Sequence, residues 1–400
     1  MTIPTGDESP VESKSRTPFP LAPVLFLVII FFLNFTSRVV LSPLLPILEP
    51  ELGMGHAEAG SLFLLMQAGY CVGLLISGFI SWRLNHRRTI LLSSLSLGIA
   101  LLGTARSTST SALRVGLVSI GTTAGLYLPS GIATITREVR PEHWGKALAL
   151  HELAPNLGYI AAPLLAEALL RVLPWHGVLG TLGALSAAMG MCYMVAGRGG
   201  RHHPGPPRVS SMALLLRDPG LWVAAMLFAV SIGAGLGFYT MMPLFLVNEV
   251  GLEREAANLI AGLCRVPGIA VVFLAGMVSD RIGHRRALTL FLAATGTLTI
   301  LLGLLHGRFV TPLLLFAQAA AAVCFFPAGF SMISLIFPAG IRGLAVSWVT
   351  VIGSLVGAGA IPAAIGYLAE TASFSAALCL LGFLALSMLP LLRFGRAIRF

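Results

Sequence analysis

Long apolar segments alternate with short polar segments along almost the whole chain. Each apolar segment is about 20 residues or longer with few charges, so as a helix rising about 1.5 Å per residue it can cross a hydrocarbon core of about 30 Å. These segments lie at residues 21–48, 58–81, 88–107, 111–136, 145–170, 176–197, 219–248, 256–280, 287–306, 310–337, 342–369 and 374–394. The pattern predicts an all-α membrane protein with twelve transmembrane helices.

A polar segment at residues 198–217 divides the predicted helices into two groups of six. It is rich in Gly, Pro, Arg and His, which neither pack a core nor enter a bilayer, and we expect a cytoplasmic linker. We therefore expect one six-helix bundle at residues 19–197 and another at 218–394. Residues 1–18 are polar and lead into a span too long for the apolar part of a signal peptide. We expect a disordered cytoplasmic tail there and a short cytoplasmic tail at 395–400.

The two groups of helices match each other at an offset of 198 residues, the distance from Gly78 to Gly276. The other matching pairs are Arg83 with Arg281, Arg87 with Arg285, Arg88 with Arg286, Pro129 with Pro327, Gly131 with Gly329, Gly145 with Gly343 and Ala147 with Ala345. The chain is therefore predicted to contain two pseudo-repeats of one six-helix unit. Parallel repeats of this kind are typical of secondary transporters whose substrate site lies between the halves, near the bilayer midplane.

The composition excludes a soluble protein. Hydrophobic residues make up 56% of the chain and charged residues 10%, against about 25% charged residues in a soluble domain. The net charge of +10 arises mainly from Lys and Arg at one end of the predicted helices, as the positive-inside rule requires when both termini are cytoplasmic. We expect a multi-pass protein of the plasma membrane, in bacteria the inner membrane, in contact with lipid and without a nucleic-acid partner.

The sequence contains none of the common catalytic or metal-binding motifs. The five cysteines lie in apolar segments without a CxxC pair, which favours core packing. His202 and His203 follow Arg201 in the predicted linker, where a solvated polar run is favoured over a metal site. A GxSxG, Walker or HExxH motif does not occur. We therefore expect no enzyme, no cofactor, no metal site and no self-contained ATP-driven pump.

One loop carries a recognisable signature. The segment after the second helix of the C-terminal half reads Gly276-Met-Val-Ser-Asp280-Arg281-Ile-Gly283-His284-Arg285-Arg286. It resembles the signature G-x-x-x-D-R-x-G-R-[RK] of the major facilitator superfamily, with His284 where the signature has the Arg after its second Gly. Together with the twelve spans, the central linker and the repeat, the resemblance covers essentially the whole chain and implies the fold of that superfamily.

The resemblance also implies a conformational latch in the C-terminal half. In this family the acid of the signature helps to hold the halves together in the outward-open state, and here only Asp280 matches it, facing the start of the eleventh helix at Arg342. A carboxylate there is stabilised electrostatically by the guanidinium and by the positive end of the helix dipole. The N-terminal copy has Trp82 and Asn85 where the signature has Asp and Gly. The residues assigned to the latch are Gly276, Asp280, Arg281, Gly283, Arg285 and Arg342.

Two arginines, Arg38 and Arg265, lie inside predicted spans. A guanidinium at the centre of a membrane helix costs about 2.5–3.5 kcal/mol on insertion scales, so each must face a cavity or a partner. Counted from the outer ends of the first and eighth helices, both lie about 14–15 Å deep, one in each half. Guanidinium forks match carboxylate, sulfonate or phosphate, and the pair therefore favours a clamp for an anion. The alternative is that helix carbonyls or Glu152 neutralise each arginine.

Further polar residues within the spans are candidates for substrate or proton binding. His151 and Glu152 lie near the inner end of the fifth helix, and either could carry a transported proton because burial raises the pKa of a carboxylate and histidine titrates near neutrality. The alternative is that Glu152 pairs with Arg137 or Lys146 and that His151 is a packing contact. The additional candidates for substrate contact, which can also be interhelical hydrogen-bonding residues, are Asn34, Gln67, Tyr70, Tyr127, Tyr239, Asn258, Gln318 and Thr350.

These features predict a monomeric secondary transporter that moves a small organic anion, in the first place a carboxylate, by alternating access with proton symport. A base in the first helix with Arg265 in the eighth is similar to the arrangement in monocarboxylate transporters, although the base here is Arg38 rather than Lys and Ala261 stands where that family has an acid.

One alternative is a proton-coupled multidrug exporter, because Ala154-Pro155-Asn156-Leu157-Gly158 resembles the Gly-Pro-x-x-Gly run of exporters. A second alternative is a transport-inactive sensor or assembly protein on the same fold.

Overall fold

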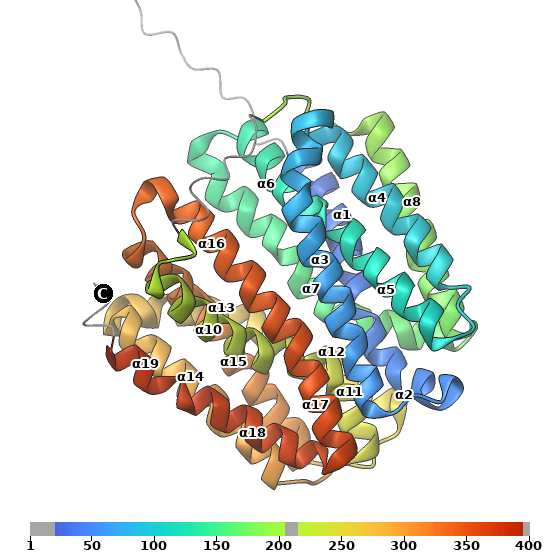
Figure 1. Cartoon of the computed structure of the whole chain (residues 1–400), viewed down its shortest axis with the longest axis vertical. Helices are drawn as coiled ribbons and strands as arrows, with labels where there is room; N and C mark the ends of the chain where they lie inside the picture. Colours follow the sequence, from blue (N-terminus) through green and yellow to red (C-terminus); the bar gives the residue numbers. More distant parts are fainter. Residues whose placement is uncertain (1–20, 205–214, 395–400) are drawn as a thin grey trace, which may run out of the picture.

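The computed structural model describes residues 21–204 and 215–394, whose helices form two bundles that lie side by side (Figure 1). These two ranges contain no strand, and the predicted all-α fold is confirmed. The predicted tails at 1–18 and 395–400 lie outside the described residues, as do residues 205–214 of the predicted linker.

The N half consists of six spans, two of which are each divided into two consecutive helices. Their bounds are α1 (Leu21–Val39) and α2 (Leu41–Leu52), α3 (His56–Leu84), α4 (His86–Thr104), α5 (Thr110–Gly125) and α6 (Tyr127–Glu138), α7 (Trp144–Leu170) after the short 3-10 helix η1 (Pro141–His143), and α8 (Trp175–Ala196).

The C half repeats this arrangement with more interruptions. Its spans are α10 (Pro219–Ile232), η2 (Gly233–Gly237) and α11 (Phe238–Asn248); α12 (Arg254–Leu263) and α13 (Val266–Ile282); α14 (His284–Leu304); α15 (Val310–Ile336); α16 (Ala339–Ser354), η3 (Leu355–Ala360) and α17 (Ile361–Thr371); and α18 (Phe374–Ser387) with α19 (Leu389–Phe394). The segments η2 and η3 are π-helical turns rich in glycine, and such turns often mark functional sites.

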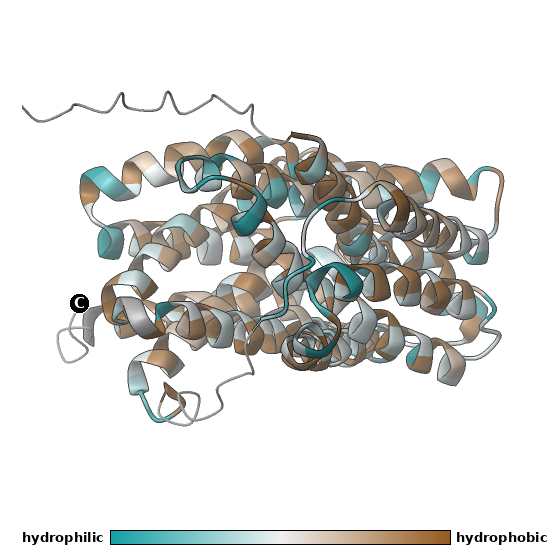
Figure 2. Cartoon of the chain, turned by 90° about the horizontal axis from the view of Figure 1, so that it is seen from above, coloured by the Kyte–Doolittle hydropathy of each residue, from teal (hydrophilic) through white to brown (hydrophobic). Residues whose placement is uncertain are grey.

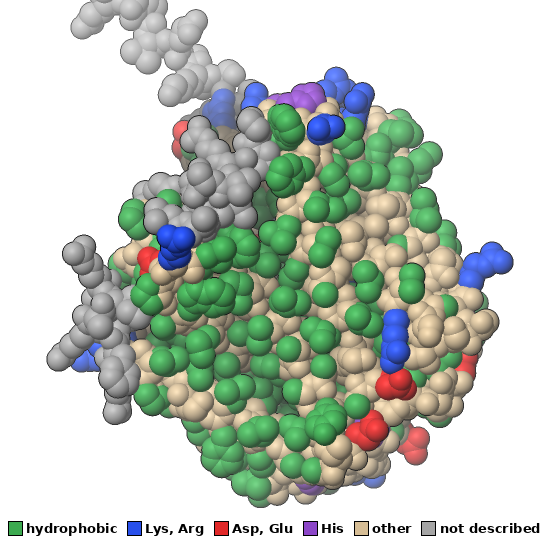
Figure 3. Space-filling view, in the orientation of Figure 1, with side chains coloured by type: hydrophobic (Ala, Val, Ile, Leu, Met, Phe, Trp, Pro, Cys, Tyr) green, Lys and Arg blue, Asp and Glu red, His purple; other side chains and the backbone are tan. Residues whose placement is uncertain are grey.

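Eleven spans in the described residues are long and apolar enough to cross a membrane. The remaining predicted span is α4, whose mean hydropathy is lowered by His86, Arg87 and Arg88 in its first turn. It packs along α5 and α8 and so lies within the N half like the other spans. Helices are mostly coloured as hydrophobic and loops as hydrophilic in Figure 2, and hydrophobic side chains cover much of the face in Figure 3.

The turn between the second and third spans confirms that the two halves share a backbone design. Gly283 connects α13 to α14 with φ of 87°, and its repeat partner Asn85 connects α3 to α4 with φ of 75°. Glycine and asparagine are the residues that adopt this left-handed region most readily. The Asn85 side chain also accepts a hydrogen bond from the Arg88 N–H and so caps α4.

Small residues allow α3 and α5 to cross at backbone contact. Gly69 and Gly73 on α3, and Gly121 and Gly125 on α5, each form a GxxxG pair. A Cβ atom at any of the four would collide with backbone atoms of the other helix. Close crossing of this kind is how membrane helices gain van der Waals contact in the absence of a hydrophobic driving force.

The two halves meet mainly at the end of the bundle opposite residues 197–204, which we call the far end, in contrast to the linker end. There Gly60 of α3 abuts the backbone of α17 at Pro362, and Gly366 of α17 abuts His56. The Ala57 N–H donates to the Glu370 carboxylate at 2.9 Å. Contacts between the halves continue along α3 as far as Cys71, whose thiol faces the Val351 carbonyl at 3.6 Å.

Candidate functional site

The two intramembrane arginines both lie against aromatic rings. Arg38 occupies the last turn of α1, and its guanidinium carbon is 3.8 Å from the ring centroid of Tyr70 on α3 and 5.2 Å from that of Phe35. A cation over an aromatic face is stabilised by the ring quadrupole without losing its charge. Arg38 is therefore held in place by rings rather than by a carboxylate.

Arg265 lies at the break between α12 and α13, which is set by a proline. Pro267 has no N–H for the carbonyl one turn earlier, so α12 ends at Leu263 and a new helix begins at Val266. The Arg265 guanidinium carbon is 4.7 Å from the ring centroid of Tyr159 and 4.8 Å from that of Tyr239. Its Nη2 donates to the carbonyl of Gly235 in the π-helical turn η2 at 2.7 Å.

A chain of aromatic rings connects the two arginines across the boundary between the halves. The rings of Phe35 and Tyr159 meet edge to face at 4.8 Å, and those of Tyr159 and Tyr239 at 4.9 Å. The Tyr239 hydroxyl donates to the Tyr159 carbonyl at 2.7 Å. Tyr159 of α7 interacts electrostatically with both Arg38 and Arg265. The tertiary structure thus brings the two cations predicted from sequence to one aromatic site.

Neither arginine has a carboxylate partner among the residues that the structure describes. The carboxylates Glu49, Glu58, Glu152 and Glu167 pair with His56, Arg114, His151 and Arg254 respectively. The Nε atoms of Arg38 and Arg265 are buried without a hydrogen-bond partner. Both arginines are half-buried, so each charge is partly withdrawn from solvent without a counter-ion, which is costly. The site therefore carries surplus positive charge that an anion would neutralise.

Most of the additional polar candidates contact backbone rather than the arginines. The Asn34 amide donates to the Ala124 carbonyl at 3.0 Å, and the Gln318 amide donates to the Ala234 carbonyl at 2.9 Å. Tyr127 donates its hydroxyl to the Leu27 carbonyl at 2.7 Å. Gln67 is buried beside Gly359 of η3, one turn before Tyr70. Among the additional candidates, Tyr70 and Tyr239 have rings that touch a guanidinium.

His151 and Glu152 differ sharply in their surroundings. The His151 side chain is 0% exposed and its Nε2 lies 3.1 Å from the Tyr127 hydroxyl oxygen. The Glu152 side chain is 60% exposed, with Oε1 3.5 Å from Nδ1 of His151. The adjacent residues therefore point to different environments, as expected for neighbours on a helix, yet their ionisable atoms remain near each other.

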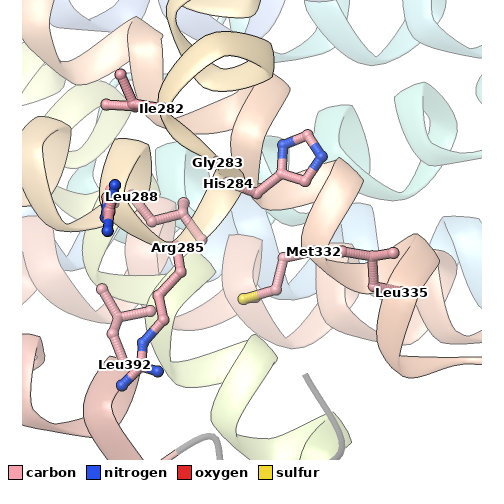
Figure 4. A pocket seen from close by; sticks show the side chains of 9 residues that line it. Ile282, Gly283, His284, Arg285, Leu288, Met332, Leu335 and Leu392 are labelled. Atoms are coloured by element: carbon pink, nitrogen blue, oxygen red, sulfur yellow. The ribbon is translucent and has the colours of Figure 1, made fainter.

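The predicted latch residues lie at the linker end, away from the arginine site. Asp280 is exposed near the end of α13, and within the described ranges it forms no ion pair with Arg342 of α16, whose Nε is buried without a partner. Gly283 and Arg285 line a cavity of about 330 Å³ with residues of α14, α15 and α19 (Figure 4). That cavity lies inside the C half. Since α13 has 17 residues, it is about 25 Å from Arg265 along the helix.

A polar tether joins the halves at the far end. The Glu167 carboxylate of α7 pairs with Arg254 of α12 at 3.1 Å and accepts a hydrogen bond from the Asn258 amide. The same amide donates to the Pro43 carbonyl of α2 at 3.1 Å. Asn258, a candidate for substrate contact, is therefore engaged in holding this end of the halves together.

Replacing the carboxylate of this tether should open the far end. A hydrogen bond to a charged group contributes about 1.5–3 kcal/mol, so Glu167→Gln should lower the ratio of closed to open molecules by about tenfold or more. Distance distributions between spin labels at positions 106 and 308, both exposed at the far end, measure this ratio. Glu253→Gln, at an exposed residue just before α12, should leave the distribution unchanged. An unaltered distribution in Glu167→Gln would show that the tether does not govern closure.

Comparisons with known proteins agree with this architecture. The family model of the Major Facilitator Superfamily matches residues 27–308 and 238–398. The cis,cis-muconate transport protein of Acinetobacter baylyi is 24% identical over 386 residues, covering 90% of each chain. A protein of Cupriavidus necator described as a probable sulfoacetate transporter is 22% identical over 335 residues, covering 77% of this chain and 75% of its own.

Solved structures show the same fold. The crystal structure of a D-xylose-proton symporter superposes with a TM-score of 0.78 at 15% identity, over 94% of this chain and 97% of its own. A bacterial homologue of the human lysosomal transporter Spinster, in an inward-facing and occupied conformation, superposes with a TM-score of 0.76 at 17% identity, over 96% of each chain.

Proposed function

The chain belongs to the major facilitator superfamily of membrane transporters, and we propose that it moves a small organic anion by alternating access, coupled to proton symport. The observation that carries the proposal is the pair of guanidinium groups, one from each half, that face one aromatic site without a carboxylate partner among the described residues. An anion bound between them would neutralise both and contact both halves.

The number of cations favours a substrate with two acidic groups. Arg38 and Arg265 each offer a guanidinium fork, and a fork matches one carboxylate or sulfonate. Muconate and sulfoacetate, the compounds in the names of the two relatives, each carry two acidic groups. The rings of Tyr70, Tyr159 and Tyr239 between and beside the cations would pack against the carbon skeleton.

The position of the site between the halves supports alternating access. The far end is closed by the Glu167 tether and by the contacts of α3 with α17, so an anion would reach the site from the linker end. Arg265 is bonded to the π-helical turn η2 and lies at the break between α12 and α13, two places where the helices lack regular hydrogen bonding. Binding of an anion to Arg265 can therefore change the conformation of η2 and of the break between α12 and α13.

Transport into proteoliposomes tests the proposal. Labelled monocarboxylates, dicarboxylates, sulfonates, phosphate esters and a lipophilic cation are offered under an inward proton gradient. We expect uptake of an anion class that depends on the gradient, with dianions preferred. Gradient-driven movement of the cation instead would support the drug-exporter alternative and contradict the anion proposal. Absence of all uptake and exchange by the wild-type protein would support the transport-inactive alternative.

Arg38→Gln should lower the apparent affinity for the anion by about ten- to a hundredfold. The substitution removes one charge while Tyr70 and Phe35 retain their packing against the shortened side chain. Losing one partner of a buried charge pair typically costs 2–5 kcal/mol, less where the other arginine still holds the anion. The concentration dependence of uptake gives the affinity. Arg106→Gln, at an exposed arginine of the far end, serves as the control and should match the wild type.

A further inference from the structure

A histidine of α7 is buried within a stack of aromatic rings from α1 and α6 of the N half. His151 of α7 stacks on Phe31 of α1 with ring centroids 4.4 Å apart and an interplanar angle of 10°. Phe31 in turn stacks on Tyr127 of α6 at 5.4 Å. The aromatic face would stabilise a positively charged imidazole through the ring quadrupole. The ring is therefore fixed in orientation and surrounded by groups that tolerate a charge.

Hydrogen bonding determines which nitrogen of neutral His151 carries the proton. A carbonyl oxygen only accepts, so the single proton of the Tyr127 hydroxyl is donated to the Leu27 carbonyl at 2.7 Å. The Tyr127 oxygen can then only accept from Nε2 of His151, which lies 3.1 Å away. Nε2 must carry the proton, and Nδ1 must present a lone pair.

That lone pair has no hydrogen-bond partner. Nδ1 is buried, and the acidic atom near it is Oε1 of Glu152 at 3.5 Å. A second proton bound at Nδ1 would turn this orphaned acceptor into a donor facing a carboxylate. The resulting imidazolium and carboxylate form an ion pair with no net charge, which burial penalises far less than a lone cation.

The other ionisable groups around His151 come from four helices. Tyr127 of α6 faces Nε2, Tyr193 of α8 interacts electrostatically with Tyr127, and Glu152 of α7 interacts electrostatically with Tyr127 and with Tyr70 of α3. On α1 the nearest stacked residue, Phe31, is uncharged, and Arg38 lies about 10 Å farther along that helix. Glu152 is thus the group whose charge connects Nδ1 with the arginine site.

We propose that Nδ1 of His151 binds the proton that accompanies the anion, and that Glu152 shares this proton in the loaded state. The proposal rests on the proposed anion transport. Without the proton, the Glu152 carboxylate repels an anion near Arg38 and Tyr70. With the proton on Nδ1, the pair is neutral and the repulsion is removed. Proton binding therefore raises anion affinity, and by thermodynamic linkage the anion raises proton affinity by the same factor.

The experiment separates proton coupling from anion binding in one preparation. Proteoliposomes containing wild type or His151→Gln are assayed for exchange of internal and external anion at equal pH and for accumulation driven by an inward proton gradient. Gln can still donate to Tyr127 from the place of Nε2 but cannot bind a proton. Because the Glu152 carboxylate stays ionised in His151→Gln, we expect this variant to bind the anion more weakly than wild type, to exchange it at saturating concentration and to lose accumulation. His143→Gln, at an exposed histidine before α7, should keep both activities.

A second variant keeps the test decisive if His151→Gln fails to fold. Glu152 is exposed enough for Glu152→Gln to be tolerated, and this variant retains the imidazole but loses the carboxylate that stabilises its charge. The pH midpoint of anion binding should then move down by about one unit. An unchanged midpoint, or full accumulation by folded His151→Gln, would overturn the proposal.

Assays of the wild-type protein distinguish a failure of the proton site at His151 from a failure of anion transport. Exchange of anion without any response to the proton gradient would overturn the proton site and leave anion transport standing. If the anion exchanges and accumulates in wild type but only exchanges in His151→Gln, the results support both the proton site and anion transport. If wild type exchanges no anion at all, the proposed function itself fails.

Discussion

Arg265→Gln is expected to lower the apparent affinity for the transported anion by about a hundredfold or more. Arg265 has its Nε buried without a partner, lies against two tyrosine rings and is anchored to the Gly235 carbonyl, so its guanidinium is held more rigidly than that of Arg38. Removing one partner of a buried, hydrogen-bonded charge pair costs about 2–5 kcal/mol, which corresponds to about thirtyfold to several thousandfold. Pro267, which sets the break between α12 and α13, is unchanged, so the break should persist.

Concentration-dependent uptake and direct anion binding to the purified protein measure this effect. Arg265→Lys keeps the charge but loses the planar fork, and its affinity should lie between those of wild type and Arg265→Gln. Arg308→Gln removes an exposed arginine from a far-end loop and should behave as wild type. If Arg265→Gln binds and transports the anion normally, Arg265 serves packing alone and the substrate lies elsewhere.

Gly121→Leu is expected to prevent correct assembly of the N half. A Cβ atom at Gly121 already collides with the Met66 carbonyl and with the backbone nitrogen of Tyr70, and backbone cannot move aside as a flexible side chain can. Overpacking costs about 1–3 kcal/mol, and more where backbones touch directly. The crossing of α3 with α5 also positions Tyr70, which holds Arg38. Stability and anion binding should therefore be lost together.

Gel filtration and thermal unfolding of the protein in detergent test this expectation. Gly103→Leu is the matched control because Gly103, on α4 of the same half, is exposed and a Cβ there meets nothing within 4 Å. It should elute as a single species with the wild-type unfolding temperature. A normal unfolding temperature for Gly121→Leu would mean that α3 and α5 can separate without loss of the bundle.

The candidate site could be predicted only in part from sequence. Arg38 and Arg265 were identifiable because an intramembrane guanidinium is expensive wherever it lies, so its presence alone indicates a cavity or partner. Tyr159 and Phe35 were missed, because aromatic residues are common in apolar helices. The available signal for Phe35 was its position one helical turn before Arg38, where two side chains share a face.

The polar amides illustrate why composition does not assign ligands. Asn34, Asn258 and Gln318 are as polar as any substrate contact, yet each donates to a backbone carbonyl of another helix. In a bilayer an amide must find an acceptor, and helix packing provides one as readily as a substrate does. Only the crossing of the helices decides between the two.

The sequence by itself determined the membrane spans, the repeat and the presence of one intramembrane arginine in each half, because apolar length, turn residues and intramembrane charge act locally along the chain. Tertiary structure decided what those cations face, which tautomer His151 adopts and which end of the bundle is closed. These properties depend on atoms brought together from helices far apart in sequence, such as Tyr159 beside both arginines and Tyr127 between Leu27 and His151. No periodicity within a single helix encodes such distances, because they are set by how the helices cross.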